Sequence, residues 1–314
     1  MSKKNDTSTK FTPTEFQFYS PKEKQSFGQI LYNSKDGTYL GRTPASWAKI
    51  LIFYAIFYTV LAGLFTICIQ GLFSTLNETE PKWKLDKSLI GTNPGMGYRP
   101  LSDETERGSV IQFDTKKPEE AQYWIQLLDD FLKQYQGEGK GGKHCEFNQT
   151  HKPEDVCVVD VEKFETCSPA NSYGYKNGRP CVFLKLNKIF DWNPQYYDNP
   201  KEFPDDMPVE LRTYINSLPA TELQQVWVSC NGTNAQDRES LGDIKYFPGQ
   251  GFPAFYYPYI NQPGYLSPLI AVQFEKLPVS HMVNVECRAW AKNIIYSGSA
   301  RDRMGSVTFQ LFID

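Results

Sequence analysis

One uncharged stretch of the chain constrains its fold more than any other feature. Residues 50–77 contain no charged side chain, and residues 50–69 alone supply the roughly 20 apolar positions that a helix needs to cross a bilayer core. A polar segment of 49 residues precedes the stretch, which is also longer than the h-region of a cleaved signal peptide. We therefore predict a cytoplasmic head at residues 1–49 and a membrane-spanning signal-anchor helix at residues 50–76.

The charge balance does not by itself orient the helix. Three basic residues lie near the membrane on each side. Because the two flanks carry equal numbers of lysine and arginine, the rule that the more basic flank stays in the cytosol does not choose between the two orientations. The head carries a formal charge of +4, and the tail beyond the helix carries −7. A mildly acidic tail gives no reason to expect a nucleic-acid partner.

The cysteines indicate that the tail lies outside the cytosol. Six of the seven cysteines follow the apolar stretch: Cys145, Cys157, Cys167, Cys181, Cys230 and Cys287. An even number in a large polar segment predicts disulfides, which persist in oxidising compartments, although the sequence leaves 15 pairings open. The seventh, Cys68, lies in the apolar stretch and is interpreted as a small packing residue.

Glycosylation sequons support the same orientation. The tail contains three, at Asn77, Asn148 and Asn231. We expect glycans at Asn148 and Asn231 and keep Asn77, which lies close to the membrane, as a third candidate. Asn5 also matches the pattern but lies in the head, where it should stay unmodified. Cysteines and sequons together predict a type II protein, with its N-terminus in the cytosol and its C-terminus outside.

The tail has the composition of a mainly-β domain. It is rich in Tyr, Phe, Pro and Gly, and most of its apolar runs are short. We predict a polar stalk at residues 77–97 and a β ectodomain at residues 98–314. The strongest helix signal lies at residues 118–136, with proline first, acidic residues in the first turn and one apolar face. That face, which should pack on a sheet, is formed by Trp124, Leu128, Phe131 and Tyr135.

Period-two alternation of apolar residues predicts several strands with one buried face. The alternating sets are Val182, Leu184 and Leu186; Val226, Val228 and Cys230; Val283, Val285, Cys287 and Ala289; and Val307, Phe309, Leu311 and Ile313. Cys230 and Cys287 thus point inward on separate strands. A bond between them would join two sheets in an immunoglobulin-like manner.

Signals for catalysis are poor. His144 and His151 lie near Cys145 and Cys157, but zinc is disfavoured because the loop has no closely spaced ligand pair and its cysteines should be oxidised. The chain contains neither a G-x-S-x-G nucleophile elbow nor an Asp-x-Asp motif. We therefore expect no catalytic residue, metal or cofactor. Two adjacent acidic pairs are interpreted as solvated surface: Asp129-Asp130 and Asp205-Asp206.

Short motifs run in order along nearly the whole chain. They are Leu31-Tyr32-Asn33, Tyr39-Leu40-Gly41-Arg42-Thr43, Trp47, Phe53-Tyr54, Phe57-Tyr58, Leu61-Ala62-Gly63, Tyr173-Gly174-Tyr175-Lys176, Gly178, Pro180-Cys181, Gly251-Phe252-Pro253, Tyr256-Tyr257-Pro258-Tyr259 and residues 269–274. Their ordered set, with one span and six external cysteines, resembles the β-subunit family of P-type pumps that the Na,K-ATPase and the H,K-ATPase share.

The resemblance implies a non-catalytic subunit in the plasma membrane. Such a subunit binds the catalytic α subunit, supports its folding, its exit from the endoplasmic reticulum and its delivery, and modulates the pump's K⁺ and Na⁺ affinity. A small single-span regulatory subunit is a further partner that the resemblance allows, besides the lipid bilayer. A Na,K partner is favoured because the tail has few sequons. An H,K-ATPase β subunit, a cell-adhesion type II glycoprotein and a Golgi transferase remain as alternatives.

The resemblance also implies particular structural roles. It implies an immunoglobulin-like β-sandwich with an added helix, long loops and three sequential disulfides: Cys145–Cys157, Cys167–Cys181 and Cys230–Cys287. Residues implied to contact α are Tyr54, Tyr58 and Gly63 in the span and Tyr173, Gly174 and Tyr175 outside. The chain departs from the family pattern at Ser168-Pro169 after Cys167, at Ile67 where a second glycine is common, and in a shortened segment after Tyr259.

Overall fold

The computed structural model describes residues 27, 31–34, 36–105, 107–136, 142–152, 154–298 and 304–314. The chain divides into two units, Met1–Leu76 and Asn77–Asp314, each of which is considered separately. The sequon at Asn5 lies outside the described residues.

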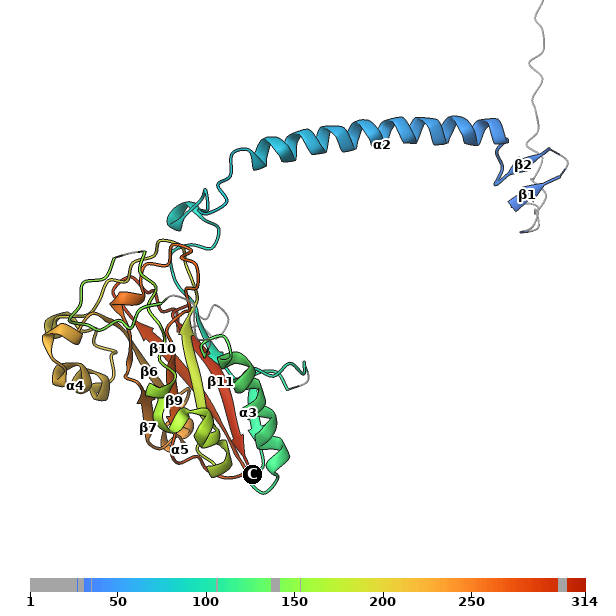
Figure 1. Cartoon of the computed structure of the whole chain (residues 1–314). Coiled ribbons are helices and arrows are strands. Elements are labelled where there is room, and N and C mark those ends of the chain that lie inside the picture. Colours follow the sequence, from blue (N-terminus) through green and yellow to red (C-terminus); the bar gives the residue numbers. More distant parts are fainter. Residues whose placement is uncertain are drawn as a thin grey trace, which may run out of the picture. The chain divides into compact units, whose positions relative to one another are not determined.

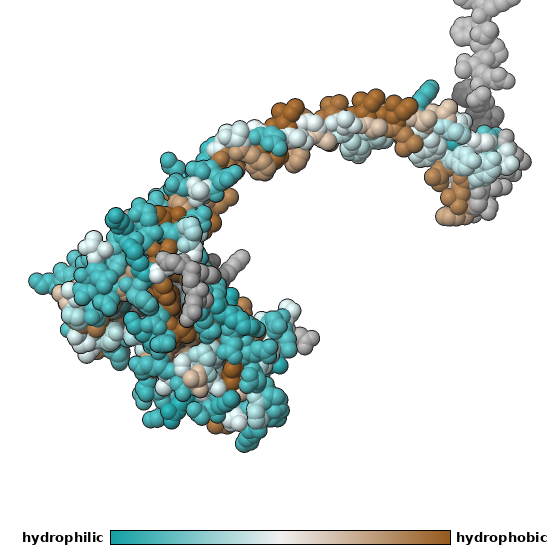
Figure 2. Space-filling view, viewed as in Figure 1, coloured by the Kyte–Doolittle hydropathy of each residue, from teal (hydrophilic) through white to brown (hydrophobic). Residues whose placement is uncertain are grey.

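A 30-residue helix, α2 (Pro44–Phe73), forms most of the described part of the first unit. Thr43 caps its start, because the Thr43 Oγ1 accepts a hydrogen bond of 3.3 Å from the Ser46 amide, and Pro44 occupies a first position that needs no donor. No residue of the helix is buried in the chain, and apolar side chains lie along its length (Figure 2). Such a helix has the length and composition to cross a membrane.

The bounds of α2 differ from the predicted span. The helix begins six residues before residue 50 and ends at Phe73, so residues 74–76 lie outside it. At 1.5 Å per residue it is about 45 Å long, which exceeds the hydrocarbon core and places its ends in the headgroup layers. Proline at the first position explains the early start, because it favours helix initiation without requiring an apolar residue.

A small hairpin precedes α2. Strands β1 (Tyr32–Asn33) and β2 (Thr38–Tyr39) pair antiparallel, with Tyr32 opposite Tyr39. Their rings lie 4.8 Å apart between centroids. The indole Nε1 of Trp47, in the first turns of α2, donates a 2.8 Å hydrogen bond to the Tyr39 carbonyl and fixes the hairpin beside the helix.

Two sheets build the second unit (Figure 1). One sheet has the order β4-β11-β10-β6-β8, and the other has the order β3-β5-β9-β7. The five strands of the first are β4 (Val110–Phe113), β6 (Gln225–Gly232), β8 (Gly251–Pro253), β10 (His281–Trp290) and β11 (Ser306–Ile313). The four strands of the second are β3 (Met96–Arg99), β5 (Cys181–Leu186), β7 (Ile244–Phe247) and β9 (Ile270–Phe274). Strand β3 thus begins two residues before the ectodomain limit predicted at residue 98.

The alternation predicted for the last two long strands is confirmed. Strands β10 and β11 pair antiparallel, with Val285 opposite Phe309, and their inward residues are buried while the intervening ones are partly exposed. Strand β4 adds to the outer side of β11 in a parallel arrangement. The apolar face of this sheet is therefore continuous across its central strands.

Side chains from the two sheets meet in one core, as the sandwich prediction requires. The Phe309 ring of β11 lies 5.0 Å from the Tyr98 ring of β3 and 6.1 Å from the Phe274 ring of β9. All three residues belong to the same buried cluster. Aromatic rings at these separations pack favourably and bury a large apolar area.

The predicted helix of the tail is present but shorter. Helix α3 (Pro118–Leu132) buries Trp124 and Leu128, and the Trp124 Nε1 donates to the Gln112 carbonyl of β4 at 2.7 Å. The chain leaves the helix at Leu132, whose carbonyl accepts from the amides of Tyr135 and Gln136 in a turn. Tyr135 is buried nonetheless. Among the described residues of the second unit, the other helical segments are α4 (Val209–Ser217), α5 (Ala235–Ser240), and the 3₁₀ segments η1 (Leu85–Lys87), η2 (Glu162–Cys167), η3 (Pro169–Asn177), η4 (Pro200–Glu202), η5 (Ala220–Glu222) and η6 (Ala254–Tyr256).

Two sequence-based expectations about strands were wrong. Cys230 and Cys287 occupy directly opposed positions on β6 and β10, which are neighbours in one sheet, so their bond does not join the two sheets. Alternation on separate strands cannot tell whether those strands pair or face each other. The expectation of one exposed face per strand fails in β5, because Phe164 and Tyr173 pack on Phe183 from outside the sheet. It fails also in β6, where Trp227 is buried between Val226 and Val228.

Candidate partner-binding site

The membrane helix presents an aromatic face. The rings of Tyr54 and Tyr58 stack with centroids 5.9 Å apart and planes inclined by 22°. Phe53 and Phe57 stack beside them at 6.2 Å. Both tyrosines are about half exposed in the chain, at 48% and 59%, because residues four apart in a helix lie one above the other with nothing else covering them. The pair therefore forms an ordered surface that is available to a partner or to lipid.

Gly63 does not belong to that face. Each helical residue advances about 100°, so Gly63 lies about 180° around the axis from Tyr54. The helix is continuous between the two positions. A single partner helix cannot contact both positions at close range, so the sequence-based grouping of Gly63 with the two tyrosines describes two faces rather than one.

The Gly63 face combines the glycine with two threonines and with bulkier neighbours, since Ile56 and Ile67 lie within about 40° of Gly63 around the axis. Nothing lies within 4 Å of a Cβ placed on Gly63. Thr59 and Thr66 lie within about 60° of it around the axis, and their hydroxyls donate to the carbonyls of Ala55 and Ala62 at 2.7 and 2.8 Å. Because the hydroxyls are satisfied within the helix, they do not oppose the packing of another helix, and the close backbone approach is confined to the position of Gly63 itself.

The Tyr173-Gly174-Tyr175 segment forms the bend of η3. Ser172, Tyr173 and Gly174 all have positive φ, so the segment consists of two short turns joined by a left-handed reversal. The Tyr173 hydroxyl donates to Asp129 Oδ1 of α3 at 2.7 Å, and the Tyr175 hydroxyl donates to the Cys181 carbonyl at 3.3 Å. Burial, together with the Asp129 carboxylate, raises the pKa of Tyr173, so its hydroxyl stays protonated as a donor.

Glycine is required at position 174. Its φ is +74°, and a Cβ there would lie 2.0 Å from the Arg179 carbonyl oxygen. The Gly174 carbonyl accepts from the Arg179 amide at 3.0 Å, and the Gln273 side-chain amide donates to the Arg179 carbonyl at 3.3 Å. The bend is therefore closed by its own backbone hydrogen bond and by the Gln273 side chain of strand β9, which together leave no room for a side chain at position 174.

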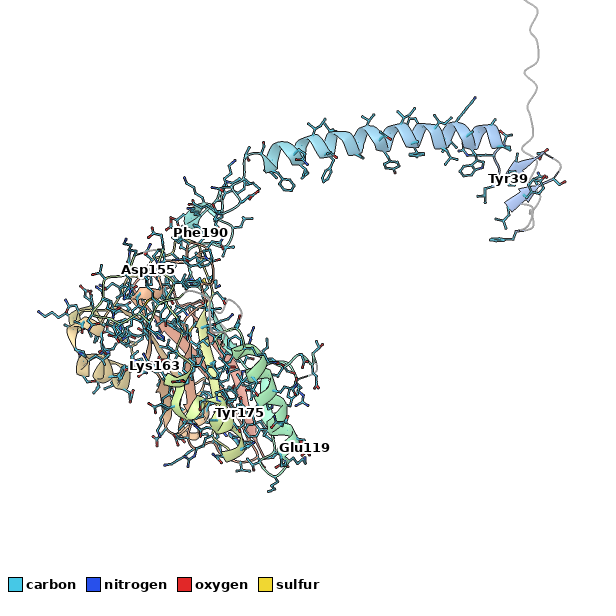
Figure 3. All side chains as sticks on the ribbon, viewed as in Figure 1. Tyr39, Glu119, Asp155, Lys163, Tyr175 and Phe190 are labelled. Atoms are coloured by element: carbon cyan, nitrogen blue, oxygen red, sulfur yellow. A yellow bond between two sulfur atoms is a disulfide. The ribbon has the colours of Figure 1, made fainter. Side chains whose placement is uncertain are left out.

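The expectation that Tyr173 and Tyr175 touch a partner directly needs correction. Both side chains are fully buried, and Tyr175 lies within the ectodomain in Figure 3. Tyr173 packs on Phe183 and Tyr175 packs on Phe113, at 5.9 and 5.1 Å between ring centroids. These residues hold the loop in place, and the surface that the loop offers is formed by exposed neighbours, among them Lys176 and Asn177.

A carboxylate fastens the far end of this loop. Glu275 lies at the end of β9, where its carboxylate meets Lys245 Nζ at 2.7 Å and Arg179 Nη1 at 3.3 Å. The hydrogen bond from Lys245, helped by the charge of Arg179, holds the pKa of Glu275 below its usual range. The two ion pairs thereby tie the segment that follows η3, and strand β7, to the residue that follows β9.

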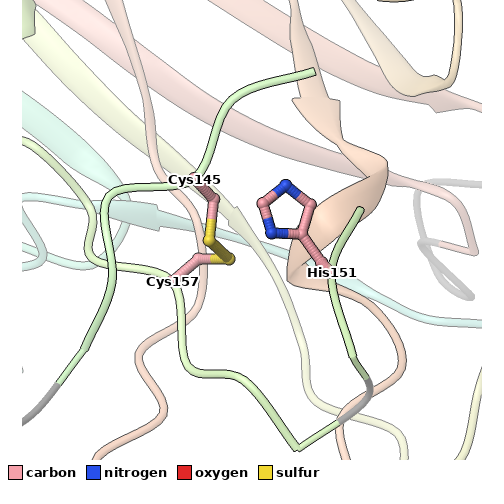
Figure 4. Close-up of side chains that lie close together, drawn as sticks. All are labelled: Cys145, His151 and Cys157. Atoms are coloured by element: carbon pink, nitrogen blue, oxygen red, sulfur yellow. A yellow bond between two sulfur atoms is a disulfide. The ribbon is translucent and has the colours of Figure 1, made fainter. Parts of the chain in front are cut away.

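The first disulfide loop contains the one trio of potential metal ligands among the described residues (Figure 4). Cys145 and Cys157 are bonded to each other, so neither offers a thiolate. The His151 ring instead contacts the Phe255 ring at 5.4 Å, and its Nε2 lies 2.9 Å from the Glu146 carbonyl oxygen. The donor chemistry of the bonded trio does not suit a metal ion.

The other two disulfides join Cys167 to Cys181 and Cys230 to Cys287. All three bonds follow the sequential order that the family resemblance implies. Cys167 and Cys181 connect η2 to the first residue of β5, next to the buried loop at Tyr173. The cysteine that remains, Cys68, is exposed on α2.

The three sequons of the tail have accessible asparagines. Asn148 lies in the first disulfide loop and Asn231 lies near the end of β6, and both are exposed. Asn77 is also exposed, and its Oδ1 accepts hydrogen bonds of 3.2 Å from the amide and the hydroxyl of Thr79. Each asparagine can therefore carry a glycan without disturbing the core.

An apolar turn near the start of the second unit was missed by the sequence analysis. Leu89 and Ile90 are almost fully exposed at the tip of a turn that the Ser88 hydroxyl closes by accepting from the Ile90 amide at 3.1 Å. Farther along, Asn93 exchanges two hydrogen bonds with the Ile295 backbone, at 2.8 and 2.9 Å. The available signal was the adjacent aliphatic pair itself, because Leu89 and Ile90 stand within a mostly polar stalk.

These observations define a single-pass membrane protein with a disulfide-bonded β-sandwich ectodomain. A model of the sodium/potassium ATPase β chain family matches residues 19–309. The chain is 59% identical to the sodium/potassium-transporting ATPase subunit beta-1 of Drosophila melanogaster over the whole of both chains. It is 45% identical to beta-2 of the same organism, over 95% of this chain and 96% of that one, and 34% identical to a probable beta-3 of Caenorhabditis briggsae, over 93% and 88%.

The chain therefore belongs to the sodium/potassium ATPase β chain family, whose members are accessory, non-catalytic subunits of the pump.

Proposed function

We propose that this chain is the β subunit that binds the catalytic α subunit of a sodium/potassium pump, supports its folding and delivery to the plasma membrane, and adjusts its affinity for K⁺ and Na⁺. The observation that carries the proposal is the full-length match to sodium/potassium-transporting subunits at 59% and 45% identity. The named relatives favour the sodium pump over the H,K-ATPase.

The proposed orientation is type II. Disulfides persist outside the cytosol, and all three lie in the second unit, as do the exposed asparagines of three sequons. The head carries the positive charge. A reducing compartment would be incompatible with this ectodomain, because its bridges stabilise it only when oxidised. Asn148 and Asn231 are the proposed glycan sites, with Asn77 as the third.

Within the membrane, the two faces of α2 are the proposed contact surfaces for α. The stacked pair Tyr54 and Tyr58 provides hydroxyls and broad ring surfaces, whereas Gly63 permits a close backbone approach. Because the faces lie on opposite sides of the helix, α would engage them with different helices. A partner that binds the folded form stabilises it, and contacts that differ between pump conformations shift apparent ion affinity.

Outside the membrane, the exposed Leu89 and Ile90 are the proposed contact in place of the buried Tyr173 and Tyr175. Burying a leucine or isoleucine side chain contributes about 1.5–3 kcal/mol. The turn is held by Ser88, so its tip is already ordered before a partner binds. Tyr173, Gly174 and Tyr175 would act on α through the loop that they position.

Purification of the full chain from mild detergent tests the proposal. A catalytic α chain should co-purify in stoichiometric amount. Replacing Tyr54 and Tyr58 together by leucine, or Gly63 by leucine, should each lower the recovered α chain and its surface level. Leu64→Phe is the matched control, because Leu64 lies between the two faces and is exposed. Equal recovery of α with all variants would exclude the span as a recognition surface.

A further inference from the structure

The hairpin before α2 is followed by an unusual turn. Leu40 and Gly41 have φ of +49° and +76°, and Tyr39 and Arg42 exchange backbone hydrogen bonds of 2.8 and 3.0 Å around them. Glycine accepts this conformation readily, whereas a leucine in it costs about 1 kcal/mol or more. The Leu40 side chain gains nothing in return within the chain, since it is 56% exposed.

A hydrogen bond fixes the Tyr39–Leu40 turn beside the first turns of the membrane helix. The Trp47 Nε1 bonds the Tyr39 carbonyl at 2.8 Å, and Tyr39 stands beside the first turns of α2 in Figure 3. Trp47 precedes residue 50, where the uncharged stretch begins, by about 4.5 Å of helix rise. The headgroup layer of each leaflet is about 5–7 Å thick. Chain geometry therefore sets Trp47 and the Tyr39–Leu40 turn in that layer.

The base of the hairpin has the chemistry of an interfacial anchor. Leu31, Tyr32, Tyr39 and Leu40 are each about half exposed, which leaves an apolar surface uncovered by the chain. Tyrosine and tryptophan favour the headgroup level because their rings are apolar and their polar atoms remain hydrated. Among the described residues of the first unit, no side chain covers this surface, and a lipid headgroup layer would suit its mixed apolar and polar character.

The charged residues that the structure describes in and beside the hairpin are placed in a way that suits a lipid headgroup layer. Arg42 and Lys49 are exposed beside the turn, at the level where lipid phosphates lie. The acidic residue of the described hairpin, Asp36, lies toward the opposite end, where its carboxylate accepts from the Asn33 side-chain amide at 2.7 Å. Positive charge thus faces the phosphates and negative charge is held away from them.

We propose that Tyr39, Leu40, Arg42 and Trp47 form a docking surface for the lipid headgroup layer at the N-terminal end of α2. The lipid covers the apolar side chains of the turn, and its phosphates pair with Arg42 and Lys49. This docking sets the depth and rotation of the membrane helix, and hence which of its faces a neighbouring helix meets. It goes beyond the proposed binding of α and does not depend on it.

Nitroxide labels at two positions test the proposal in the full chain. A label is attached at Leu40→Cys or at Ser34→Cys, the exposed hairpin end, in a Cys68→Ala background whose other cysteines are disulfide-bonded. The chain, with any subunit that co-purifies, is placed in phosphatidylcholine bilayers with or without phosphatidylserine. The ratio of collisions with oxygen to collisions with a water-soluble nickel chelate should be several-fold higher at position 40 than at position 34.

Two further measurements keep the outcome unambiguous. Leu40→Asn preserves the left-handed turn, which asparagine tolerates, but removes the apolar side chain. In bilayers, this substitution should increase trypsin cleavage after Arg42 several-fold. A second comparison is made at a neighbouring trypsin site that wild type and the Arg42→Gln/Lys49→Gln variant both keep. There, phosphatidylserine should slow trypsin cleavage of wild type more than it slows cleavage of the variant. Equal collision ratios at positions 40 and 34 would overturn the proposal. So would shielding of position 40 from both quenchers, because that pattern indicates coverage by protein.

Discussion

The hydroxyl of Tyr173 donates a 2.7 Å hydrogen bond to Asp129, a residue 44 positions away on helix α3. The bond connects helix α3 to the reversed loop of η3, whose Tyr173 ring packs on Phe183 of β5. Asp129 belongs to an acidic pair that the sequence suggested was merely solvated. The contact explains why Tyr173, in a segment that was expected to face a partner, instead stabilises the packing of η3 against α3.

Removal of this hydroxyl should weaken the ectodomain. Tyr173→Phe leaves a partly buried carboxylate without its donor, and we expect a loss of about 2 kcal/mol in unfolding free energy. Chemical denaturation of the oxidised protein measures it. Tyr123→Phe is the matched control, because Tyr123 also donates to an aspartate, Asp103, but at the surface; its effect should stay below about 0.5 kcal/mol. Equal losses would show that burial does not set the strength of the bond.

Glycine at position 174 should be far less replaceable than glycine at position 178. Gly174→Ala combines a left-handed φ with a Cβ 2.0 Å from the Arg179 carbonyl oxygen, so we expect a loss of about 3 kcal/mol and poor surface delivery. Gly178→Ala shares the positive φ but meets its nearest atom at 3.5 Å, and should lose about 1 kcal/mol. Thermal unfolding midpoints distinguish the two, and similar midpoints would contradict the steric argument.

Stability should fall in acid partly through Glu275. Its pKa in the folded chain lies below the ordinary 4.5, because Lys245 and Arg179 favour the ionised carboxylate. The stabilisation is therefore complete above the unfolded-state pKa and is lost as the pH falls through the lower folded-state pKa. Glu275→Gln should be less stable than wild type at neutral pH and should approach it in acid. Because the two cations are exposed, added salt should shrink the difference. A constant difference between pH 7 and acid would count against the assignment.

The apolar turn should matter for assembly and not for folding. Leu89→Ser with Ile90→Ser removes surface that we propose α covers, so less α should co-purify while the unfolding midpoint stays unchanged. Val209→Ser and Val279→Ser provide controls, since both side chains are about two-thirds exposed and lie elsewhere in the ectodomain. Unchanged α recovery with the double variant would remove the turn from the proposed interface.

The three disulfides should differ in their contribution. The Cys230–Cys287 bond closes 57 residues and the Cys145–Cys157 bond closes 12. By loop entropy, removing the first should cost about 4 kcal/mol and removing the second about 3 kcal/mol. Paired alanine variants, compared by denaturation, should follow that order. A larger loss for the Cys145–Cys157 pair would mean that local packing, including the contact of His151 with Phe255, outweighs chain entropy.

Local pattern was sufficient for several elements. The absence of charge predicted a membrane helix, and the 3.6-residue period of Trp124 and Leu128 predicted a helix that packs on the sheet. The alternation in β10 and β11 predicted which residues are buried. Each of these signals depends on side chains that are close together in the sequence, where backbone geometry fixes which of them share a face.

Only the tertiary structure decided the relationships between distant segments. It showed that Cys230 and Cys287 are neighbours in one sheet, that Tyr173 and Tyr175 are buried beneath their loop, and that Leu89 and Ile90 are exposed. Burial of a residue depends on what packs above it, and the covering segment can be anywhere in the chain. The sequence by itself therefore determined a membrane anchor, a mainly-β tail and a family, whereas strand pairing and long-range packing decided which residues remain available to a partner.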